Sequence, residues 1–194
     1  PHTIAQAKRH YGIQGDYLLY LGTLHPRKNL GRLIDAFQQA IKTVKNQAIQ
    51  LVIAGKPGWL YNAIYEQVQQ LGLTNRVIFP GYIAAAHKPA LLSGAKAYVF
   101  PSLYEGFGLP VLEAMACGVP VLTSDVSSLP EVAGEAALLV NPHHTEAIAA
   151  GLIQLLNDAA LRQSLIAQGF EQINKFSWRT AASQVLEILE AVGN

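Results

Sequence analysis

The sequence contains a single cysteine, Cys117, and this scarcity excludes several classes of protein. One cysteine cannot form an internal disulfide framework, and it cannot supply the several thiolates of a structural zinc site. Small secreted domains generally depend on such crosslinks, so the composition is typical of a protein from a reducing compartment. Cys117 lies at the end of an apolar helical pattern, and we expect it to be a buried thiol.

An excess of either charge is also missing. The 194 residues include 14 Lys and Arg against 13 Asp and Glu, which gives a formal net charge of +1. A dedicated nucleic-acid-binding protein needs a basic excess to neutralise phosphates, so the composition argues against one. With 51% hydrophobic residues and only 14% charged residues, the chain can bury a sizeable core and is not expected to be disordered.

Long apolar runs are absent as well. No stretch reaches the 18 apolar residues expected of a membrane span, and no basic segment followed by an apolar one opens the chain. The sequence begins at Pro1 rather than at Met. We therefore expect a piece of a longer protein that carries neither a transmembrane segment nor a secretory signal.

Short apolar runs alternate with amphipathic helical patterns along the chain. Strands are predicted at residues 17–22, 49–54, 77–79, 97–100, 119–123 and 137–140. Helices are predicted at 30–45, from 64 to about 72, at 84–93, from 110 onward, and at 145–157, 159–173 and 178–192. This alternation predicts an α/β, Rossmann-like domain of three layers, with a parallel sheet covered by helices on both faces.

The loops after the strands carry the residues that suggest chemistry. Parallel strands joined by right-handed crossovers end at one edge of the sheet, where such folds bind ligands. Arg27 and Lys28 follow the first strand, and the glycine-rich segment 106–110 follows the fourth and leads into a helix. A helix N-terminus favours an anion, and the two cations suit a diphosphate. Glu113, one turn into the helix, can accept hydrogen bonds from two sugar hydroxyls.

Each of these features has an ordinary structural interpretation when taken alone. A Gly-x-Gly turn is often simple turn chemistry, an Arg-Lys pair is usually solvated, and a glutamate in a first helical turn usually interacts with the helix dipole. The dinucleotide fingerprint G-x-G-x-x-G is not matched, because Val111 stands at the third glycine position and the segment follows the fourth strand instead of the first. A P-loop is also absent.

Several segments resemble one known family, in order and over nearly the whole chain. Residues 105–121, EGFGLPVLEAMACGVPV, closely resemble the E-x7-E block of the family 4 (group 1) retaining glycosyltransferases of the GT-B fold. The similar segments on either side are 20–30, 51–55, 77–82, 128–134 and 137–142. In that family such a sequence is the C-terminal, donor-binding domain. A second Rossmann-like domain precedes it and carries most of the acceptor site.

The resemblance implies roles for individual residues. Glu105 matches the glutamate beside the donor sugar and is the catalytic candidate, Glu113 matches the one that holds the ribose hydroxyls, and Lys28 matches a lysine that contacts the diphosphate. Many members carry an arginine where this chain has Thr23, and we expect Arg27 to supply that charge instead. The other expected donor-binding residues are Gly22, Thr23, Gly55, Tyr82, Ile83, Gly106, Phe107, Gly108 and Leu109.

The resemblance also implies an organisation for the whole protein. Residues 1–16 are expected to be a lead-in from the missing N-terminal domain, 17–175 the nucleotide-sugar-binding domain, and 176–194 a C-terminal crossover helix. The expected activity is the transfer, with retention, of a hexose from a nucleotide diphosphate sugar, either GDP-mannose or a UDP-sugar. The fragment alone is expected to be inactive. No cofactor or metal is expected, and the location is expected to be cytoplasmic or peripheral at the inner membrane face.

Two alternatives remain open on the sequence. A nucleotide-sugar 2-epimerase can share the GT-B fold, although the glutamate spacing and the segment 128–134 favour the transferase. A non-catalytic nucleotide-binding or interaction module is the alternative from a different class. Intact Glu105, Glu113 and Lys28 argue against it.

Overall fold

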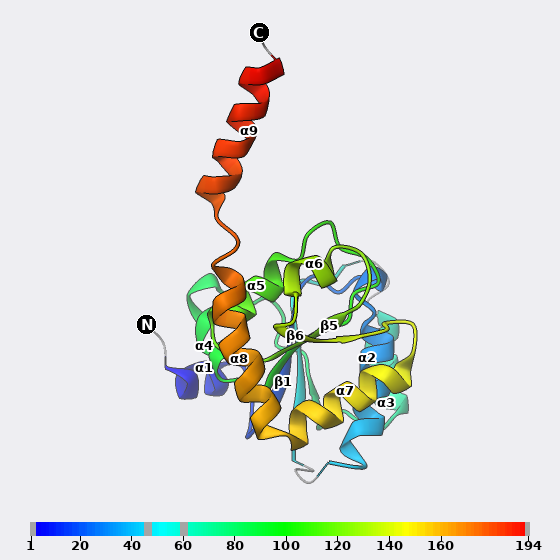
Figure 1. The fold of residues 1–194 in the computed structure, drawn as a ribbon. Coiled ribbons are helices and arrows are strands. Elements are labelled where there is room, and N and C mark those ends of the chain that lie inside the picture. Colours follow the sequence, from blue (N-terminus) through cyan, green and yellow to red (C-terminus); the bar gives the residue numbers. More distant parts are fainter. Residues whose placement is uncertain (1–2, 45–47, 59–61, 193–194) are drawn as a thin grey trace.

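The chain folds around one parallel sheet with helices on both faces (Figure 1). The computed structural model describes residues 3–44, 48–58 and 62–192. The strands are β1 (Tyr17–Leu21), β2 (Gln50–Ala54), β3 (Val77–Ile78), β4 (Ala97–Phe100), β5 (Val121–Ser124) and β6 (Ala137–Val140). They pair in parallel in the order β3-β2-β1-β4-β5-β6. The predicted α/β, Rossmann-like fold is confirmed.

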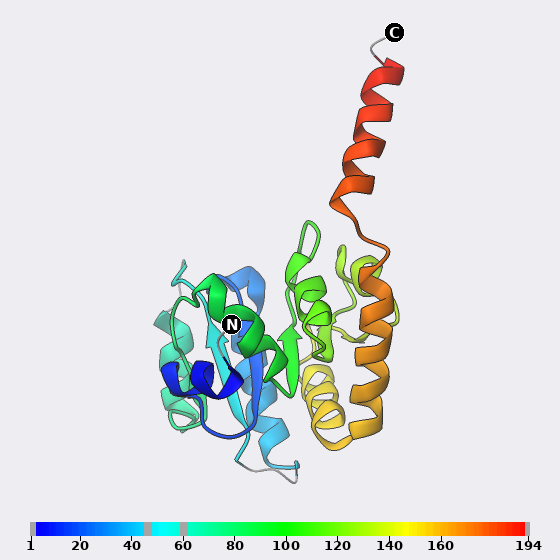
Figure 2. The ribbon, with the colours of Figure 1, turned by 90° about the vertical axis from the view of Figure 1, so that its left-hand side faces the viewer.

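The helices form two layers. The α-helices are α1 (Ile4–His10), α2 (Leu30–Ile41), α3 (Asn62–Gln70), α4 (Lys88–Ser93), α5 (Leu109–Ala116), α6 (Leu129–Ala133), α7 (Thr145–Asn157), α8 (Ala159–Ile173) and α9 (Trp178–Val192). Two 3-10 turns, η1 (Pro26–Lys28) and η2 (Ala85–His87), precede α2 and α4. Helix α2 packs against α3 and α7 on one side of the sheet, while α1 packs against α4 and α5 against α8 on the other (Figures 1 and 2).

Most element predictions are confirmed, and the differences lie at element ends and in short turns. The strands predicted at 97–100 and 137–140 match β4 and β6, and the last three predicted helices match α7, α8 and α9 to the residue. The helix predicted at 30–45 ends at Ile41, and the strand predicted from 119 begins at Val121. The predictions include neither η1 nor α6, because a single helical turn is too short to show a hydrophobic period.

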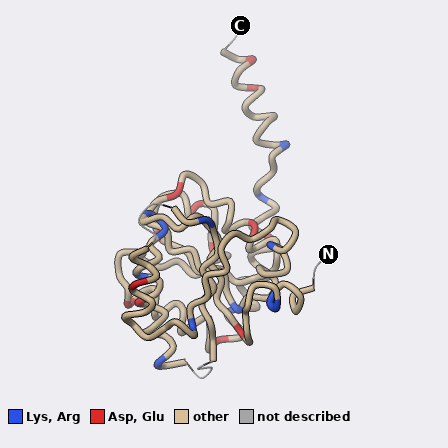
Figure 3. Tube along the Cα trace, turned by 180° about the vertical axis from the view of Figure 1, so that it is seen from behind, with Lys and Arg blue, Asp and Glu red and all other residues tan. Residues whose placement is uncertain are grey.

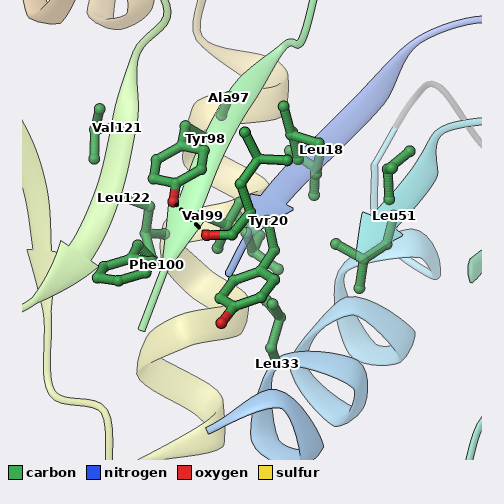
Figure 4. Packing of buried hydrophobic residues seen from close by; sticks show 14 of the residues in the cluster. Leu18, Tyr20, Leu33, Leu51, Ala97, Tyr98, Val99, Phe100, Val121 and Leu122 are labelled. Atoms are coloured by element: carbon green, nitrogen blue, oxygen red, sulfur yellow. Dashed lines mark hydrogen bonds between the residues drawn. The ribbon is translucent and has the colours of Figure 1, made fainter. Parts of the chain in front are cut away.

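The central strands are buried on both faces, which explains their continuous apolar sequences. Every residue of β1, β2, β4 and β5 is buried. Tyr20 and Phe100 stack with their ring centroids 6.0 Å apart, and side chains from both helix layers complete the core (Figure 4). The Tyr98 hydroxyl donates to the backbone oxygen of Leu21 at 3.1 Å, so the polar end of this fully buried ring has a partner. Burial raises the pKa of Tyr98 well above its usual value.

The last helix differs from all the others. Helix α9 projects away from the body of the molecule (Figures 1 and 2), and across Trp178–Val192, all of which the structure describes, no residue is buried. Its apolar residues are exposed, with Trp178 at 80% and Val192 at 82%. None of the described helices is both long enough and apolar enough to cross a membrane.

Asn29 connects three loops at the carboxyl edge of the sheet. Its side-chain nitrogen donates to the backbone oxygens of Pro101, at 3.1 Å, and Pro142, at 2.7 Å. These prolines follow β4 and β6, whereas Asn29 lies between η1 and α2. Asn29 is 5% exposed, and its backbone is left-handed, with φ of 60°. Asparagine tolerates that conformation better than most residues and also supplies the bridging amide.

Two substitutions of Asn29 separate the amide from the backbone conformation. Asn29→Gly keeps the left-handed backbone but leaves two carbonyl oxygens without their donor, which should lower the free energy of unfolding by about 2 kcal/mol. Asn29→Ala should lose about 1 kcal/mol more, because its Cβ disfavours positive φ. Urea denaturation of the three proteins measures both steps. Equal stability of the Gly variant and the wild type would show that the bridge contributes nothing.

Candidate functional site

The site lies where the strand order reverses. Strands β1 and β4 are neighbours in the sheet, although β2 and β3 lie between them in the sequence. Ligands of open α/β sheets bind outside the carboxyl ends of the strands at such a reversal. The loop after β1 carries Arg27 and Lys28, and the loop after β4 carries Glu105 and Gly106. The backbone N–H of Leu103 donates to the oxygen of Arg27 at 2.9 Å, which joins the two loops.

A cluster of three charged side chains, Arg27, Lys28 and Glu105, occupies this reversal. Lys28 Nζ donates to Glu105 Oε1 at 2.5 Å, and Arg27 Nη1 lies 2.7 Å from Glu105 Oε2. The Lys28 and Glu105 side chains are each 11% exposed, whereas the Arg27 side chain is 40% exposed. Both predicted diphosphate-binding cations therefore contact the predicted catalytic carboxylate.

The environment of this cluster favours charged groups. Lys28 Nζ lies 4.7 Å from the centre of the Phe100 ring, which adds a cation–π contact. Burial raises the pKa of the Glu105 carboxyl, but the hydrogen bonds from Lys28 and Arg27 outweigh burial and hold the pKa below its usual value of 4.5. Glu105 is thus an anion at neutral pH.

The backbone of the glycine-rich loop is hydrogen-bonded to two serines at the start of α6. Ser128 Oγ lies 2.9 Å from the backbone oxygen of Glu105 and 2.6 Å from that of Phe107, and Ser127 Oγ accepts from the Glu105 N–H at 3.1 Å. The sequence reasoning assigned no site role to these serines. The only indication in the sequence was that Ser128 begins the family-like segment 128–134 and that Ser127 precedes it. Their contacts with the glycine-rich loop span more than 20 residues, so no local pattern predicts them.

The two glycines of the loop differ in what the fold requires of them. Gly108 caps α5 with φ of 118°, and a Cβ there would stand 2.9 Å from Leu129 Cδ2. Gly106 has no left-handed φ, and nothing lies within 4 Å of where its Cβ would stand. Folding therefore requires glycine at 108 but not at 106. A glycine at 106 is consistent with the close approach of a ligand to the backbone.

A cavity of about 370 Å³, the base-side cavity, lies beside the charged cluster, over the ends of β1 and β2. Five predicted donor-binding residues line it: Gly22, Thr23, Gly55, Tyr82 and Ile83. The other lining residues are Leu21, Ala54, Lys56, Ala85, Lys88 and Pro110. A Cβ on Gly55 would stand 1.8 Å from the backbone oxygen of Gly22, so the two loops touch here through their backbones.

Three predicted residues, Phe107, Leu109 and Glu113, line a second groove instead. This groove, of about 640 Å³, runs from α5 to the start of α9. Glu113 nevertheless reaches the edge of the base-side cavity, because its Oε2 lies 2.5 Å from Nζ of Lys88, which lines that cavity. The Glu113 side chain is 45% exposed and is accessible to a ligand.

The wall of the base-side cavity is connected to the start of the chain through Tyr11. The Tyr11 hydroxyl lies 2.7 Å from Nδ1 of His87 and accepts from the N–H of Ala84 at 3.3 Å. Ala84 and His87 flank Ala85, which lines the cavity. Sequence reasoning did not predict this connection, and it assigned no site role to Lys56 or Lys88, because none of them lies in a motif with a defined spacing.

Positions of Lys and Arg are interspersed with positions of Asp and Glu along the trace in the view of Figure 3. Within residues 3–44, 48–58 and 62–192, no group of three or more His, Cys, Asp or Glu side chains is arranged to hold a metal ion.

Comparisons with known proteins bear on the family and on the fold. Residues 6–172 match the family model described as Glycosyl transferases group 1. Over 170 residues the chain is 39% identical to the O-antigen chain mannosyltransferase B of Escherichia coli, which covers 88% of this chain and 44% of that protein. The chain therefore spans less than half the length of this relative.

Solved structures of similar fold include a member of the same family. A sucrose-phosphate synthase from Thermosynechococcus elongatus superposes with a TM-score of 0.83 at 30% identity, covering 98% of this chain and 49% of that one. The C-terminal domain of the glycosyl transferase group 1 family protein LpcC from Francisella tularensis superposes with a TM-score of 0.78 at 27% identity. In that case the match covers 90% of this chain and 93% of the other, so the two folded units are of similar size.

The lowered pKa of Glu105 predicts a dependence of stability on pH. Its ionised form stabilises the folded state above pH 4.5, and this contribution is lost as the pH falls through the lowered pKa. Gln at this position does not titrate. The difference in unfolding free energy between the wild type and Glu105→Gln should therefore be largest at neutral pH and shrink in acid.

The exposed Glu135 supplies the matched control for this measurement. Glu135→Gln should differ from the wild type by a small amount that hardly changes with pH. Chemical denaturation from pH 7 down to about pH 3 compares the three proteins. A wild-type advantage over Glu105→Gln that stays constant across this range would contradict the role of the ion pairs.

Proposed function

The chain belongs to the glycosyl transferases of group 1, and we propose that it is the donor-binding domain of a retaining enzyme that takes a sugar from a nucleotide diphosphate sugar. The observation that carries this proposal is the charged cluster beside the base-side cavity, at the reversal of strand order. A nucleotide diphosphate has an anionic part and a flat, largely apolar part. The cluster suits the first and the cavity suits the second.

The cations would bind the diphosphate. Lys28 is largely buried and fixed by Glu105, and Arg27 reaches the same carboxylate from a more exposed position. Ionised donors bind phosphate oxygens more strongly than neutral ones do. The N–H groups at the start of α5 face the same region, where the helix dipole favours negative charge. A diphosphate placed here would share Arg27 and Lys28 with Glu105.

Glu113 and Glu105 would act on the two sugars of the donor. Glu113 is half exposed between the base-side cavity and the second groove, where its carboxylate can accept hydrogen bonds from the ribose hydroxyls. Glu105 would lie beside the transferred sugar, held as an anion by the two cations. Its negative charge would stabilise the positive charge that develops at the anomeric carbon as the bond to the diphosphate breaks. We assign no nucleophile.

Mannose is the proposed transferred sugar. The support is the 39% identity to a protein named as a mannosyltransferase, together with the resemblance of the loop at residues 22–29 to bacterial mannosyltransferases. GDP-mannose is then the proposed donor, with a UDP-sugar as the alternative. The proposed acceptor is a growing polysaccharide, after the O-antigen chain in the name of that relative.

The complete enzyme is proposed to include an N-terminal domain. The chain spans 44% of the mannosyltransferase and 49% of the synthase that it resembles, which leaves room for a second domain in each. Residues 1–16 would lead in from that domain and 176–194 would return to it, with 17–175 as the folded unit between them. The exposed apolar residues of α9 and the second groove at its start are suitable surfaces for contact with it.

Sugar transfer is accordingly proposed for the complete protein and not for these residues alone. We place that protein in the cytoplasm, in keeping with its single free cysteine, and in peripheral contact with the inner membrane face where surface polysaccharides are assembled. No metal or cofactor takes part in the proposed reaction.

The two glycines of the loop give a test of donor binding. The wild-type chain should bind at least one of GDP, UDP and ADP in a calorimetric titration. Gly106→Ala should unfold like the wild type but bind that nucleotide about tenfold more weakly, because its Cβ occupies space that only a ligand would need. Gly108→Ala should instead lower the stability, because its Cβ meets Leu129 and its φ is left-handed. No binding of any nucleotide by the wild type would refute the proposed function.

Arg27 and Lys28 can be tested separately. Loss of a charge-assisted contact to the diphosphate should cost about 1.5–3 kcal/mol of binding free energy in Lys28→Ala and also in Arg27→Ala. The nucleoside without phosphates should bind both variants and the wild type alike. If Arg27→Ala leaves nucleotide affinity unchanged while Lys28→Ala weakens it, then Arg27 does not replace the arginine that many members carry at the position of Thr23.

A further inference from the structure

The base-side cavity contains a lysine, Lys56, to which no role has been given so far. Hydrogen-bonding side chains on its lining come from Thr23, Lys56, Tyr82 and Lys88. The only charged residues among the lining residues are the two lysines. A ligand in this cavity therefore meets cationic donors on the lining, while the carboxylate of Glu113 lies at the edge, paired with Lys88.

The two lysines are in different situations. Lys88 forms an ion pair, because its Nζ lies 2.5 Å from Glu113 Oε2. Lys56 Nζ lies 5.1 Å from the centre of the Tyr82 ring, and within the described part of the chain no carboxylate lies at ion-pair distance from it. The ammonium group of Lys56 thus keeps its hydrogen-bonding capacity for a ligand.

The base of the Lys56 side chain is held in place. The Lys56 backbone oxygen accepts from the N–H of Leu24 at 3.0 Å, and the preceding Gly55 N–H donates to the oxygen of Gly81 at 2.8 Å. Lys56 itself is exposed, and its Nζ contacts the face of the Tyr82 ring, which also lines the cavity. The backbone hydrogen bonds therefore fix where the side chain starts, and its exposed end is accessible to a ligand.

The order of groups in a nucleotide indicates what would face Lys56. With the diphosphate at Arg27 and Lys28 and the ribose at Glu113, the base is the part that extends into the cavity. The volume of about 370 Å³ lies in the range of small-molecule sites. Lysine nitrogen only donates hydrogen bonds, so it needs acceptors on the edge of the base. Guanine offers O6 and N7, whereas adenine carries an amino donor in place of O6.

We propose that Lys56 is a specificity-determining residue that recognises the carbonyl edge of the base and makes the domain prefer guanine to adenine. This rests on the proposed donor-binding function and adds to it the residue that selects the base. Guanine and adenine are similar in size and stacking surface, so the preference depends on the hydrogen-bonding edge alone. Uracil, which also has a carbonyl oxygen but is smaller, would be accepted less tightly.

Calorimetric titration of GDP and ADP into the 194-residue chain and into Lys56→Met tests the proposal. The wild type should bind GDP about tenfold or more tightly than ADP, which is the effect of one hydrogen bond to a charged group. In Lys56→Met, which keeps an unbranched side chain but removes the ammonium group, most of this ratio should disappear through weaker GDP binding, while the affinity for ADP changes little. Lys42→Met, at an exposed position after α2, is the matched control and should keep the ratio.

The outcomes separate this proposal from the proposed function. If the wild type binds neither nucleotide, nor UDP, then the proposed function fails and this inference fails with it. If the wild type binds nucleotides but prefers ADP, or if Lys56→Met keeps the preference for GDP, then only the inference is overturned. An equal loss of GDP and ADP affinity in Lys56→Met also overturns it, because that result would show a general electrostatic attraction instead of recognition of the base.

Discussion

The reversal of strand order between β1 and β4 is the constraint on which the site depends. It brings together two loops that are 77 residues apart in the sequence, so that Lys28 can reach Glu105. It also lets Asn29 bridge the carbonyls of Pro101 and Pro142. If each strand were added beside the one before it, β2 and β3 would lie between β1 and β4 and would separate these loops. Neighbouring strands in a sheet generally lie about 4.7–4.9 Å apart. The charges and glycines that matter would then be present without forming a site.

The same arrangement brings opposite charges together in one cluster. Arg27 and Lys28 both contact Glu105, which keeps the cations in place and keeps the carboxylate ionised despite partial burial. A bound diphosphate carries more negative charge than one carboxylate, so it can compete for these cations without having to order them first. Its arrival would also weaken the hold of the cations on Glu105. The protein therefore pre-organises both the binding charges and the proposed catalytic carboxylate through one set of contacts.

The sequence predicts well what depends on local pattern and poorly what depends on distant contacts. The predicted bounds match to the residue for strands β4 and β6 and for helices α7 to α9. Each strand is a continuous apolar run, and each helix is long enough to show a helical hydrophobic pattern. The turn η1, which holds Arg27 and Lys28, is only three residues long and shows none. The family resemblance implied that Glu105 shares a site with Arg27 and Lys28. The ion pairs between them depend on the order of the strands in the sheet, and no local sequence pattern predicts that order. The contact of Tyr11 with His87 spans 76 residues and has no motif.

Both ends of the chain reach the elements that surround the proposed nucleotide site. Near the start, Tyr11 contacts Ala84 and His87, which immediately precede Lys88 on the cavity wall. Near the end, the first turns of α9 line the second groove together with Glu113, the partner of Lys88. Helix α9 buries none of its residues here, and an isolated helix of 15 residues is only marginally stable in water. Within the described residues, helix α9 therefore gains no stability from tertiary packing, and its apolar residues stay exposed beside the groove that holds Glu113.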